Sequence, residues 1–308
     1  MKIAITGALG HIGSYLIRYL AETPTVDSIV MIDDLSTQRY SSLFNLQNSA
    51  EHHFVQGNLL ELNLEKKFEG VDVVIHLAAI TDAANSFNIK DLVQQNLLLT
   101  KKIAEACCNK GVALIFPSTT SVYGTQKEIV SEDCSEDDLK PQSPYAETKL
   151  NEEILLTSMG RSDSLKYIVC RFGTIFGTSP GMRFHTAVNK FCWQAAMRQP
   201  ITVWKTALDQ KRPYLEILDA SRAIEFILHR RLFDGNIYNV LTLNSTVRDI
   251  TDIIQESIPS LEIELTESKI MNQLSYEVAN DKFRNLNFEF KGDLRKSIQE
   301  TLALLSPS

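Results

Sequence analysis

The sequence predicts an α/β protein, with a doubly wound parallel sheet followed by a smaller C-terminal α/β lobe. In the first half of the chain, short apolar segments rich in β-branched residues, such as VDVVIHL at 71–77, alternate with helical patterns. This alternation is typical of a parallel sheet covered by helices on both faces. Beyond Gly177 the pattern becomes irregular. We therefore expect one domain at 1–177 and a second lobe at 178–308, of which about 210–232 returns to the first domain.

The individual elements follow from apolar spacing and from capping residues. The expected strands are Lys2–Thr6, Ser28–Ile32, His53–Val55, Val71–Leu77, Ala113–Pro117 and Tyr167–Phe172. The expected helices of the first domain are Ile12–Ala21, Asp91–Cys108 and a helix that opens at Ser143-Pro144 and ends near Gly160. Ser and Pro are favoured at a helix start and Gly at its end. In the lobe, helical spacing occurs at Trp193–Arg198, Ala220–Arg230, Val247–Ser257 and Asp293–Leu305.

Composition excludes several classes of function. The 308 residues are 44% hydrophobic and 22% charged, as in an ordinary globular protein, and the net charge of −7 argues against a nucleic-acid partner. Apolar stretches such as 71–80 are far shorter than the roughly 20 residues that span a bilayer, so no membrane partner is expected. The chain passes directly into KIAIT, with no signal peptide, and its five cysteines show no C-x-x-C spacing. We expect a cytoplasmic protein with reduced thiols and no metal site.

A glycine-rich turn follows the first strand. Gly7, Gly10 and Gly13 form G-x-x-G-x-x-G between a strand and a helix. Glycines alone would also suit a tight turn or close helix packing. At the start of a βαβ unit, however, they let backbone N–H groups approach a pyrophosphate at a helix N-terminus, so the pattern predicts a bound dinucleotide.

The second strand ends in Asp33-Asp34, 20 positions after Gly13. An acidic residue there accepts hydrogen bonds from the adenosine ribose hydroxyls and repels a 2′-phosphate. NAD is therefore the expected cofactor, and the nearby Arg39 keeps NADP as the alternative.

Two Tyr-x-x-x-Lys pairs occur, Tyr123 with Lys127 and Tyr145 with Lys149. The second pair lies in the expected capped helix, where side chains four residues apart are neighbours, and we favour it as catalytic. A free tyrosine has a pKa of about 10, and a nearby ammonium lowers that value. Tyr145 could then act as a base toward a substrate hydroxyl. The alternative is an exposed pair without a role.

Hydroxyl side chains also follow the fifth strand, at 118–121. The carboxyl ends of parallel strands are where α/β sheets bind ligands, so one of these hydroxyls could orient the substrate. The pattern does not choose among the four.

Several segments together resemble the extended short-chain dehydrogenases, specifically the NAD-dependent nucleotide-sugar epimerases and dehydratases (UDP-glucose 4-epimerase-like), which have a Rossmann fold. The motifs are TGALGHIG at 6–13, HLAA at 76–79, PSTTSVYG at 117–124, PQSPYAETK at 141–149, RFGTIFG at 171–177, KRPYLEILDASRAI from Lys211, and NIYNV at 236–240.

The resemblance implies roles for individual residues. Tyr145 is implied to be the base, Lys149 its partner, and Thr119 the hydroxyl that meets the reacting group. The implied NAD contacts are Gly7, Gly10, His11, Ile12, Gly13, Asp33, Asp34, Asn58, Leu59, Leu77, Ala78, Ala79, Asn96, Tyr145, Lys149 and Phe172. The implied contacts with a nucleoside diphosphate sugar are Thr81, Thr119, Thr120, Thr174, Arg212 and Tyr276.

The resemblance implies a 4-epimerase that works through a 4-keto sugar. Thr120 and Ser121 stand where the family's sugar 4,6-dehydratases carry an acidic pair, which disfavours dehydration. A 4-keto reductase or an unusual dehydratase remains the alternative, followed by a non-catalytic NAD-binding sensor. The resemblance further implies a homodimer formed through the helices at 91–108 and 143–160.

Overall fold

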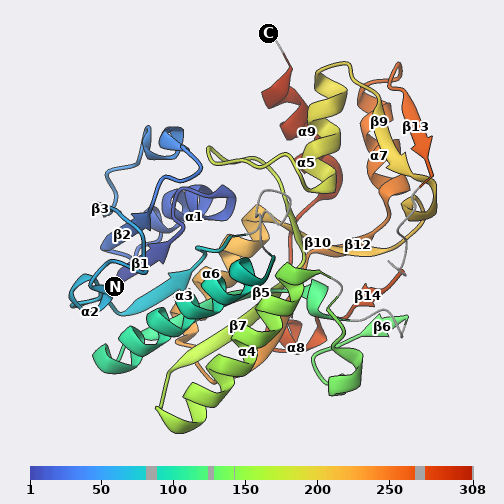
Figure 1. The fold of residues 1–308 in the computed structure, drawn as a ribbon. Helices are drawn as coiled ribbons and strands as arrows, with labels where there is room; N and C mark the ends of the chain where they lie inside the picture. Colours follow the sequence, from blue (N-terminus) through green and yellow to red (C-terminus); the bar gives the residue numbers. More distant parts are fainter. Residues whose placement is uncertain (81–88, 124–127, 142, 268–274, 307–308) are drawn as a thin grey trace.

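The computed structural model describes residues 1–80, 89–123, 128–141, 143–267 and 275–306. Its centre is a seven-stranded sheet in the order β11-β7-β5-β4-β1-β2-β3, with every neighbouring pair parallel (Figure 1). The strands are β1 (Lys2–Thr6), β2 (Ser28–Asp33), β3 (Glu51–Gln56), β4 (Val73–His76), β5 (Ala113–Thr119), β7 (Tyr167–Phe172) and β11 (Ile237–Val240). The strand order reverses between β1 and β4, and ligands bind at such a switch point in doubly wound sheets. The predicted fold class is confirmed.

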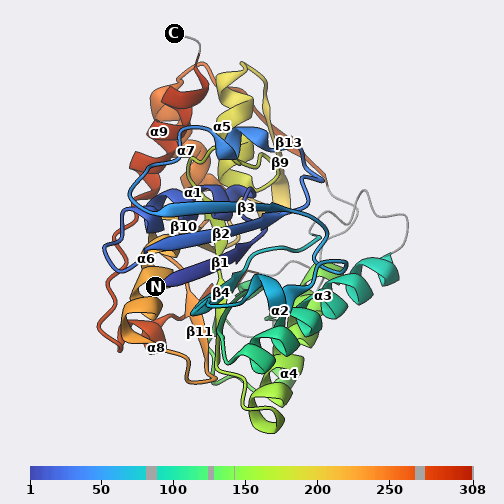
Figure 2. The same ribbon diagram turned by 90° about the vertical axis from the view of Figure 1, so that its left-hand side faces the viewer.

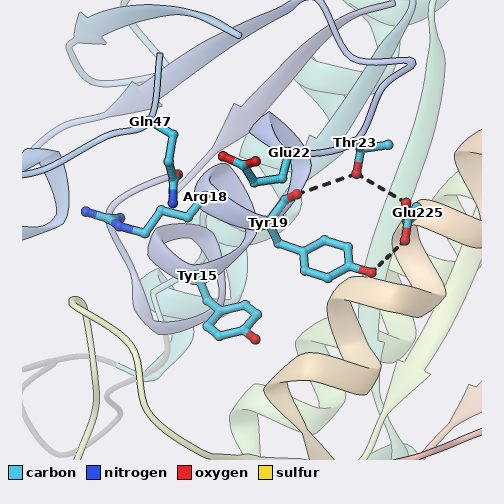
Figure 3. Close-up of a pocket in the computed structure, with 7 residues that line it drawn as sticks. All are labelled: Tyr15, Arg18, Tyr19, Glu22, Thr23, Gln47 and Glu225. Atoms are coloured by element: carbon cyan, nitrogen blue, oxygen red, sulfur yellow. Dashed lines mark hydrogen bonds between the residues drawn. The ribbon is translucent and has the colours of Figure 1, made fainter. Parts of the chain in front are cut away.

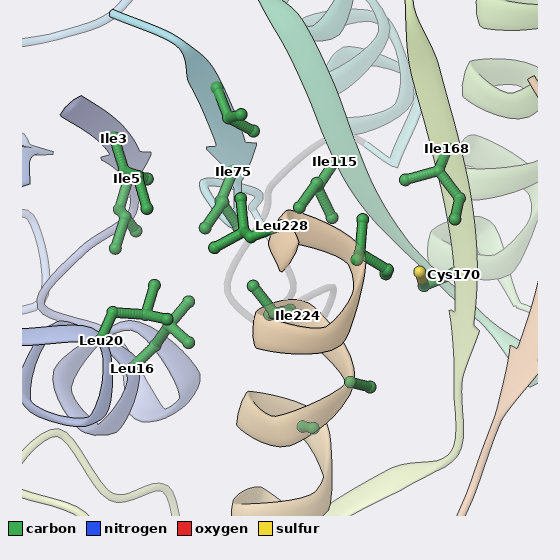
Figure 4. Close-up of a cluster of buried hydrophobic side chains, with 14 of the residues drawn as sticks. Ile3, Ile5, Leu16, Leu20, Ile75, Ile115, Ile168, Cys170, Ile224 and Leu228 are labelled. Atoms are coloured by element: carbon green, nitrogen blue, oxygen red, sulfur yellow. The ribbon is translucent and has the colours of Figure 1, made fainter. Parts of the chain in front are cut away.

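Helices cover both faces of this sheet (Figure 2). One layer contains α1 (His11–Ala21) and α6 (Ile217–Arg230), and the other contains α2 (Leu64–Lys67), α3 (Ile89–Lys110) and α4 (Pro144–Ser162). Successive strand residues point to opposite faces, so Ile3 and Ile5 pack against α1 and α6 (Figure 4), whereas Ala4 packs on the α3 and α4 side. Burial on both faces is why the inner strands β1, β2 and β4 are mostly apolar, whereas the edge strand β3, with the sequence EHHFVQ, has no buried residue.

Most of the remaining elements form a lobe, whose helices α5, α7 and α9 are drawn at the top of Figures 1 and 2. A three-stranded sheet of β8 (Thr174–Phe176), β10 (Arg212–Glu216) and β12 (Leu243–Ser245) joins it to the large sheet. The lobe contains α5 (Ala187–Ala196), α7 (Val247–Ser257), α9 (Leu294–Leu305), β9 (Ile201–Trp204) and β13 (Ile263–Thr266). The short pair β6 (Ile129–Val130) and β14 (Glu277–Val278), with α8 (Asp281–Arg284), completes the chain. Besides α6, the later segments α8 and β11 also lie with the large sheet.

One helix lies elsewhere than predicted. The pattern at 193–198 indicated a helix, whereas α5 begins at Ala187 and ends at Ala196. Its buried side chains Val188, Phe191, Cys192 and Ala195 pack on α7 and α9. Its N-cap residue Thr186 is of a type favoured at helix starts, but its side chain makes no capping bond and donates instead to the Ile175 backbone oxygen at 3.4 Å. Within the described residues, no helix is both long and apolar enough to cross a membrane.

Candidate active site

In the glycine turn between β1 and α1, a side chain at Gly7 or Gly13 would collide with neighbouring backbone atoms. Gly7 has a φ of +65°, and a Cβ there would lie 2.7 Å from the Ala78 nitrogen; a Cβ at Gly13 would lie 2.5 Å from the Gly7 oxygen. Gly10 is the N-cap of α1 and supplies no side chain to cap it. The first N–H groups of α1 are therefore open to an anion, and the turn fits a dinucleotide pyrophosphate.

Asp33 closes β2 beside this turn. Its carboxylate accepts hydrogen bonds from the backbone nitrogens of Leu9 and Leu35, both at 3.0 Å. Each carboxylate oxygen retains acceptor capacity, which suits ribose hydroxyls. Asp34 is exposed and accepts from the Ser36 nitrogen at 2.9 Å, which places it in the turn after the strand. Burial lowers the pKa of the half-buried Arg39 guanidinium, and the charge of Asp33 opposes that shift.

The adenine side of the predicted site lies at the end of β3. Asn58 is exposed and Leu59 is buried. The backbone N–H of Gly57 donates to the backbone carbonyl of Asp33 at 3.0 Å, and this bond joins the ends of β2 and β3. Lys102 of α3 donates from Nζ to the carbonyls of 59, 60 and 62. The sequence did not predict these contacts of Lys102, because a lysine on an amphipathic helix is usually a solvent-exposed charge.

The segment after β4 faces the glycine turn. Leu77 donates its backbone N–H to the Thr6 oxygen at 3.0 Å, and Ala78 donates to Thr6 Oγ1 at 3.3 Å. Asn96 holds Ile80 with both ends of its amide, at 2.9 Å each, so it fixes the end of the segment that includes Ala79. Thr81, a predicted substrate contact, lies outside the described residues.

The favoured Tyr-Lys pair lies on α4. Ser143 caps this helix by accepting from the Ala146 nitrogen at 3.2 Å, with Pro144 in its first turn. Tyr145 is half-buried, and the Lys149 side chain is only 3% exposed. Burial lowers the pKa of Lys149, but the charges of Glu152 and Tyr145 outweigh it, so the net shift is upward.

The end of β5 lies next to this helix. α4 packs against β5 and against the 3-10 turn Thr120–Val122 that follows it. Thr119 pairs with Phe172 across the sheet, and its hydroxyl accepts from the Ser121 nitrogen at 3.1 Å, which leaves its O–H able to donate. The structure thus brings Tyr145, Lys149 and Thr119 to one end of the sheet.

The competing tyrosine is in a different environment. Tyr123 is 1% exposed and donates its hydroxyl to Asn239 at 2.7 Å, and burial raises its pKa. Because the side chain is almost completely buried and its raised pKa keeps the hydroxyl protonated, Tyr123 is unsuited to accept a proton from a substrate. Its possible partner Lys127 lies outside the described residues.

The predicted substrate residues meet above the end of β5. The guanidinium of Arg212 lies 5.0 Å from the ring centre of Tyr276, and the Tyr276 hydroxyl donates to the Thr120 oxygen at 3.4 Å. Thr174 pairs with Tyr214, two residues beyond Arg212 on β10. Burial lowers the pKa of Arg212. This arrangement links a cation, an aromatic ring and the hydroxyl turn.

His11 connects the glycine turn to residues near α5. Its Nδ1 lies 2.7 Å from Ser179 Oγ, and its Nε2 lies 3.4 Å from Asn189 Nδ2. Burial lowers the pKa of His11 to about 3, aided by the charges of Arg183 and Arg39, so the ring is neutral. Ile12 follows it in α1. Neither Ser179 nor Asn189 was predicted, because these contacts join residues far apart in the sequence.

A separate surface pocket of about 420 Å³ lies along α1 beyond its first turn (Figure 3). Three of its polar side chains are paired with one another: Tyr19 and Thr23 both donate to Glu225, at 2.6 and 3.2 Å. It contains no residue predicted for the cofactor or the substrate, so we do not assign the chemistry to it.

Fold and site together define a dinucleotide-binding enzyme of the short-chain dehydrogenase type. The chain belongs to the NAD dependent epimerase/dehydratase family, whose model matches residues 3–240, and its cofactor is NAD.

Relatives and solved structures agree with this assignment. An uncharacterized UDP-glucose epimerase of Bacillus subtilis (strain 168) is 32% identical over 250 residues, which cover 78% of this chain and 76% of the relative. A trifunctional UDP-glucose 4,6-dehydratase/UDP-4-keto-6-deoxy-D-glucose 3,5-epimerase/UDP-4-keto-L-rhamnose-reductase of Arabidopsis thaliana is 28% identical; the match covers 98% of this chain but 46% of that protein. The crystal structure of a UDP-glucuronic acid 4-epimerase from Bacillus cereus, solved with UDP-glucuronic acid and NAD, is similar with a TM-score of 0.86 and 26% identity, covering 99% of each chain.

Proposed function

We propose that this protein is an NAD-dependent epimerase of a nucleoside diphosphate sugar, and that it inverts C4 through a 4-keto intermediate. The observation that carries the proposal is the placement of Tyr145 and Lys149 on α4, which packs against β5, the strand that ends at Thr119, and against the turn that follows it. In this proposal residues 1–177 hold NAD, and the lobe at 178–308 holds the sugar nucleotide, with α6 returning to the first domain.

The residues have complementary tasks. Tyr145 accepts the proton of the C4 hydroxyl and later returns it, and the Lys149 ammonium stabilises the phenolate form. Thr119 donates its O–H to the reacting oxygen. NAD supplies the hydride-transfer chemistry when bound. Arg212 grips the diphosphate, because its planar guanidinium matches phosphate oxygens, and Tyr276 limits the space for the sugar.

The test is a set of nucleotide sugars, UDP-, dTDP- and GDP-linked, incubated with purified protein and catalytic NAD and followed by NMR. We expect inversion at one carbon without net NADH. Tyr145→Phe should lose activity by about 10²–10⁴-fold while still binding NAD. If the wild-type protein leaves every hexose unchanged, the proposal fails.

A 4-keto reductase or dehydratase is the second candidate, because the plant relative carries both activities in its name. The turn after β5 argues against dehydration: residues 119–122 are Thr, Thr, Ser and Val, and the Thr120 hydroxyl already donates to the Phe172 oxygen at 3.2 Å. A reductase would consume NADH stoichiometrically, and the same NMR experiment with NADH would show it.

We also propose a homodimer in the cytoplasm. Leu98 on α3 and Ile154 on α4 are 53% and 60% exposed, on the two helices that the resemblance assigns to the interface. All five cysteines are free, which suits a reducing compartment. Light scattering should give twice the chain mass, and a Leu98→Glu, Ile154→Glu double variant should give a monomer.

A further inference from the structure

A continuous chain of buried polar side chains leads to Lys149, one member of the proposed catalytic pair. It runs from Thr6 on β1 through His76 on β4 and Thr100 on α3 to Glu152 and Lys149 on α4. Relative exposures are 0% for Thr6 and Thr100, 1% for His76 and Glu152, and 3% for Lys149. Five polar groups without access to water must satisfy one another.

The hydrogen bonds of this chain of side chains have a consistent direction. Ala78 N–H donates to Thr6 Oγ1 at 3.3 Å, and the Thr6 hydroxyl donates to His76 Nδ1 at 2.7 Å. The opposite ring nitrogen, Nε2, donates to Thr100 Oγ1 at 3.2 Å, and the Thr100 hydroxyl donates to Glu152 Oε1 at 2.6 Å. This assignment makes His76 neutral, and burial accordingly lowers its pKa to about 3. Every donor therefore points toward the Glu152 carboxylate, which favours its ionised form.

The second oxygen of Glu152 faces the catalytic lysine. Glu152 Oε2 lies 3.1 Å from Lys149 Nζ, and this ammonium is its one partner within the described part of the chain. The neighbouring Glu153 is occupied differently: it pairs with Arg171 at 2.6 Å and accepts from the Ser118 hydroxyl. Of the two buried glutamates, only Glu152 is therefore in a position to balance the charge of Lys149 directly.

A lysine buried to this extent needs such a partner. Burial disfavours the charged form of an amine and can lower its pKa by several units, whereas an opposite charge within about 4–6 Å restores it. The ring of Phe116 lies 4.3 Å from the Lys149 ammonium and adds a weaker cation–π contact. A neutral Lys149 could not stabilise a Tyr145 phenolate.

We propose that Glu152 is a positioning residue for the reaction proposed above, on which this inference rests. It holds the Lys149 ammonium protonated and fixed behind Tyr145, and the chain of side chains Thr6–His76–Thr100 holds Glu152 ionised. The titratable groups that face Lys149 are Tyr145, Glu152 and Glu153 on α4 and His76 on β4; α3 contributes the uncharged Thr100.

The direct test measures the charge of Lys149 without substrate or cofactor. Protein labelled with ¹³C at the lysine ε-carbons is titrated by NMR, and the Lys149 signal is assigned by its absence in Lys149→Met. We expect E152Q to lower the pH midpoint of Lys149 deprotonation by about 1–3 units relative to wild type. E147Q makes the same chemical change at an exposed position of the same helix, and it should leave the midpoint unchanged.

Thr100→Val provides a second variant that keeps every charge. It removes the hydroxyl that donates to Glu152 Oε1, and we expect a smaller lowering of the same midpoint. If E152Q does not fold, Thr100→Val carries the test. A Lys149 midpoint that stays at the wild-type value in the folded variants overturns the inference, whatever the protein's activity.

Kinetics distinguish this inference from the proposed function. In E152Q we expect a new alkaline decline of kcat, with the midpoint that NMR finds for Lys149, and a KM for the sugar nucleotide within about twofold of wild type. Loss of stability alone would not move a pH profile in this way. If wild type turns over no nucleotide sugar, the proposed function fails while the NMR result still decides the role of Glu152.

Discussion

Gly181 packs directly against the glycine turn between β1 and α1, and its replacement by alanine tests how the position of this residue affects NAD binding. Its N–H donates to Ser14 Oγ at 2.8 Å, and a Cβ would lie 2.3 Å from the Leu9 oxygen and 2.6 Å from the Gly10 oxygen. These are backbone carbonyls of the glycine turn, so no flexible side chain can give way. To reach ordinary contact near 3.4 Å, the two segments must separate by about 1.1 Å.

The magnitude follows from this displacement. Overpacking of this kind costs about 1–3 kcal/mol of folding free energy. The peptide units at Leu9 and Gly10 lead into the first N–H groups of α1, and a hydrogen bond to a charged group contributes about 1.5–3 kcal/mol. Weakening one such bond to the pyrophosphate raises the Kd for NAD by about tenfold or more.

Isothermal titration of Gly181→Ala with NAD, together with urea unfolding, measures both effects. The matched control is Gly111→Ala at the end of α3. There φ is +67° and a Cβ meets no atom within 4 Å, so we expect a stability loss of about 1–2 kcal/mol and an unchanged Kd. If Gly181→Ala loses stability but binds NAD as tightly as the control, the segment around Gly181 has moved while the glycine turn has kept its position, and the reasoning is wrong.

Other changes act on single contacts. Lys102→Met keeps the aliphatic stem but removes three bonds to the carbonyls beyond β3, so titration should show NAD affinity falling by about 3–10-fold; an unchanged Kd would contradict the role given to that loop. Arg212→Lys keeps the charge but loses the planar fork, so KM for the sugar nucleotide should rise about tenfold at constant NAD affinity, and steady-state kinetics decide. His11 and His76 both have a pKa lowered to about 3 by burial, so the unfolded chain binds protons before the folded one does. The contribution of these two histidines to the free energy of unfolding should be complete above about pH 6.5 and should fall toward pH 3, by up to about 1.4 kcal/mol per pH unit for each histidine. Urea unfolding curves at several pH values that show no such decline would refute this.

Local signals in the sequence account for much of the fold and part of the site. The inner strands of the sheet are largely apolar segments, and the start of α4 carries its cap in Ser143-Pro144, so both were predictable; the edge strand β11 was not among the predicted strands. The glycine turn and Asp33 were predictable for the same reason, since their spacing follows from one βαβ unit. Tyr145 stood out from Tyr123 only through its place in a capped helix.

The contacts that escaped prediction depend on tertiary packing. Ser179 meets His11 across 168 positions, and Glu152 meets Thr100 across 52. Nothing in the local pattern distinguishes Glu152 from a solvated helical glutamate, because its burial follows from the packing of α3 against α4. The start of α5 was missed for a related reason: its apolar face is defined by α7 and α9, which follow later in the chain.

The two adjacent glutamates of α4 show how one helix sets both halves of the proposed site. Consecutive residues of a helix point about 100° apart, so Glu152 turns toward Lys149 and α3, whereas Glu153 turns toward the sheet. There Glu153 binds Ser118 of β5 and Arg171 of β7, the residues immediately before Thr119 and Phe172. Glu153 therefore fixes the strand ends that carry Thr119, the hydroxyl proposed to face the substrate, while Glu152 is proposed to fix the charge beside Tyr145. A rotation or shift of α4 would disturb both at once, which is a physical reason for burying two carboxylates in succession despite their cost of desolvation.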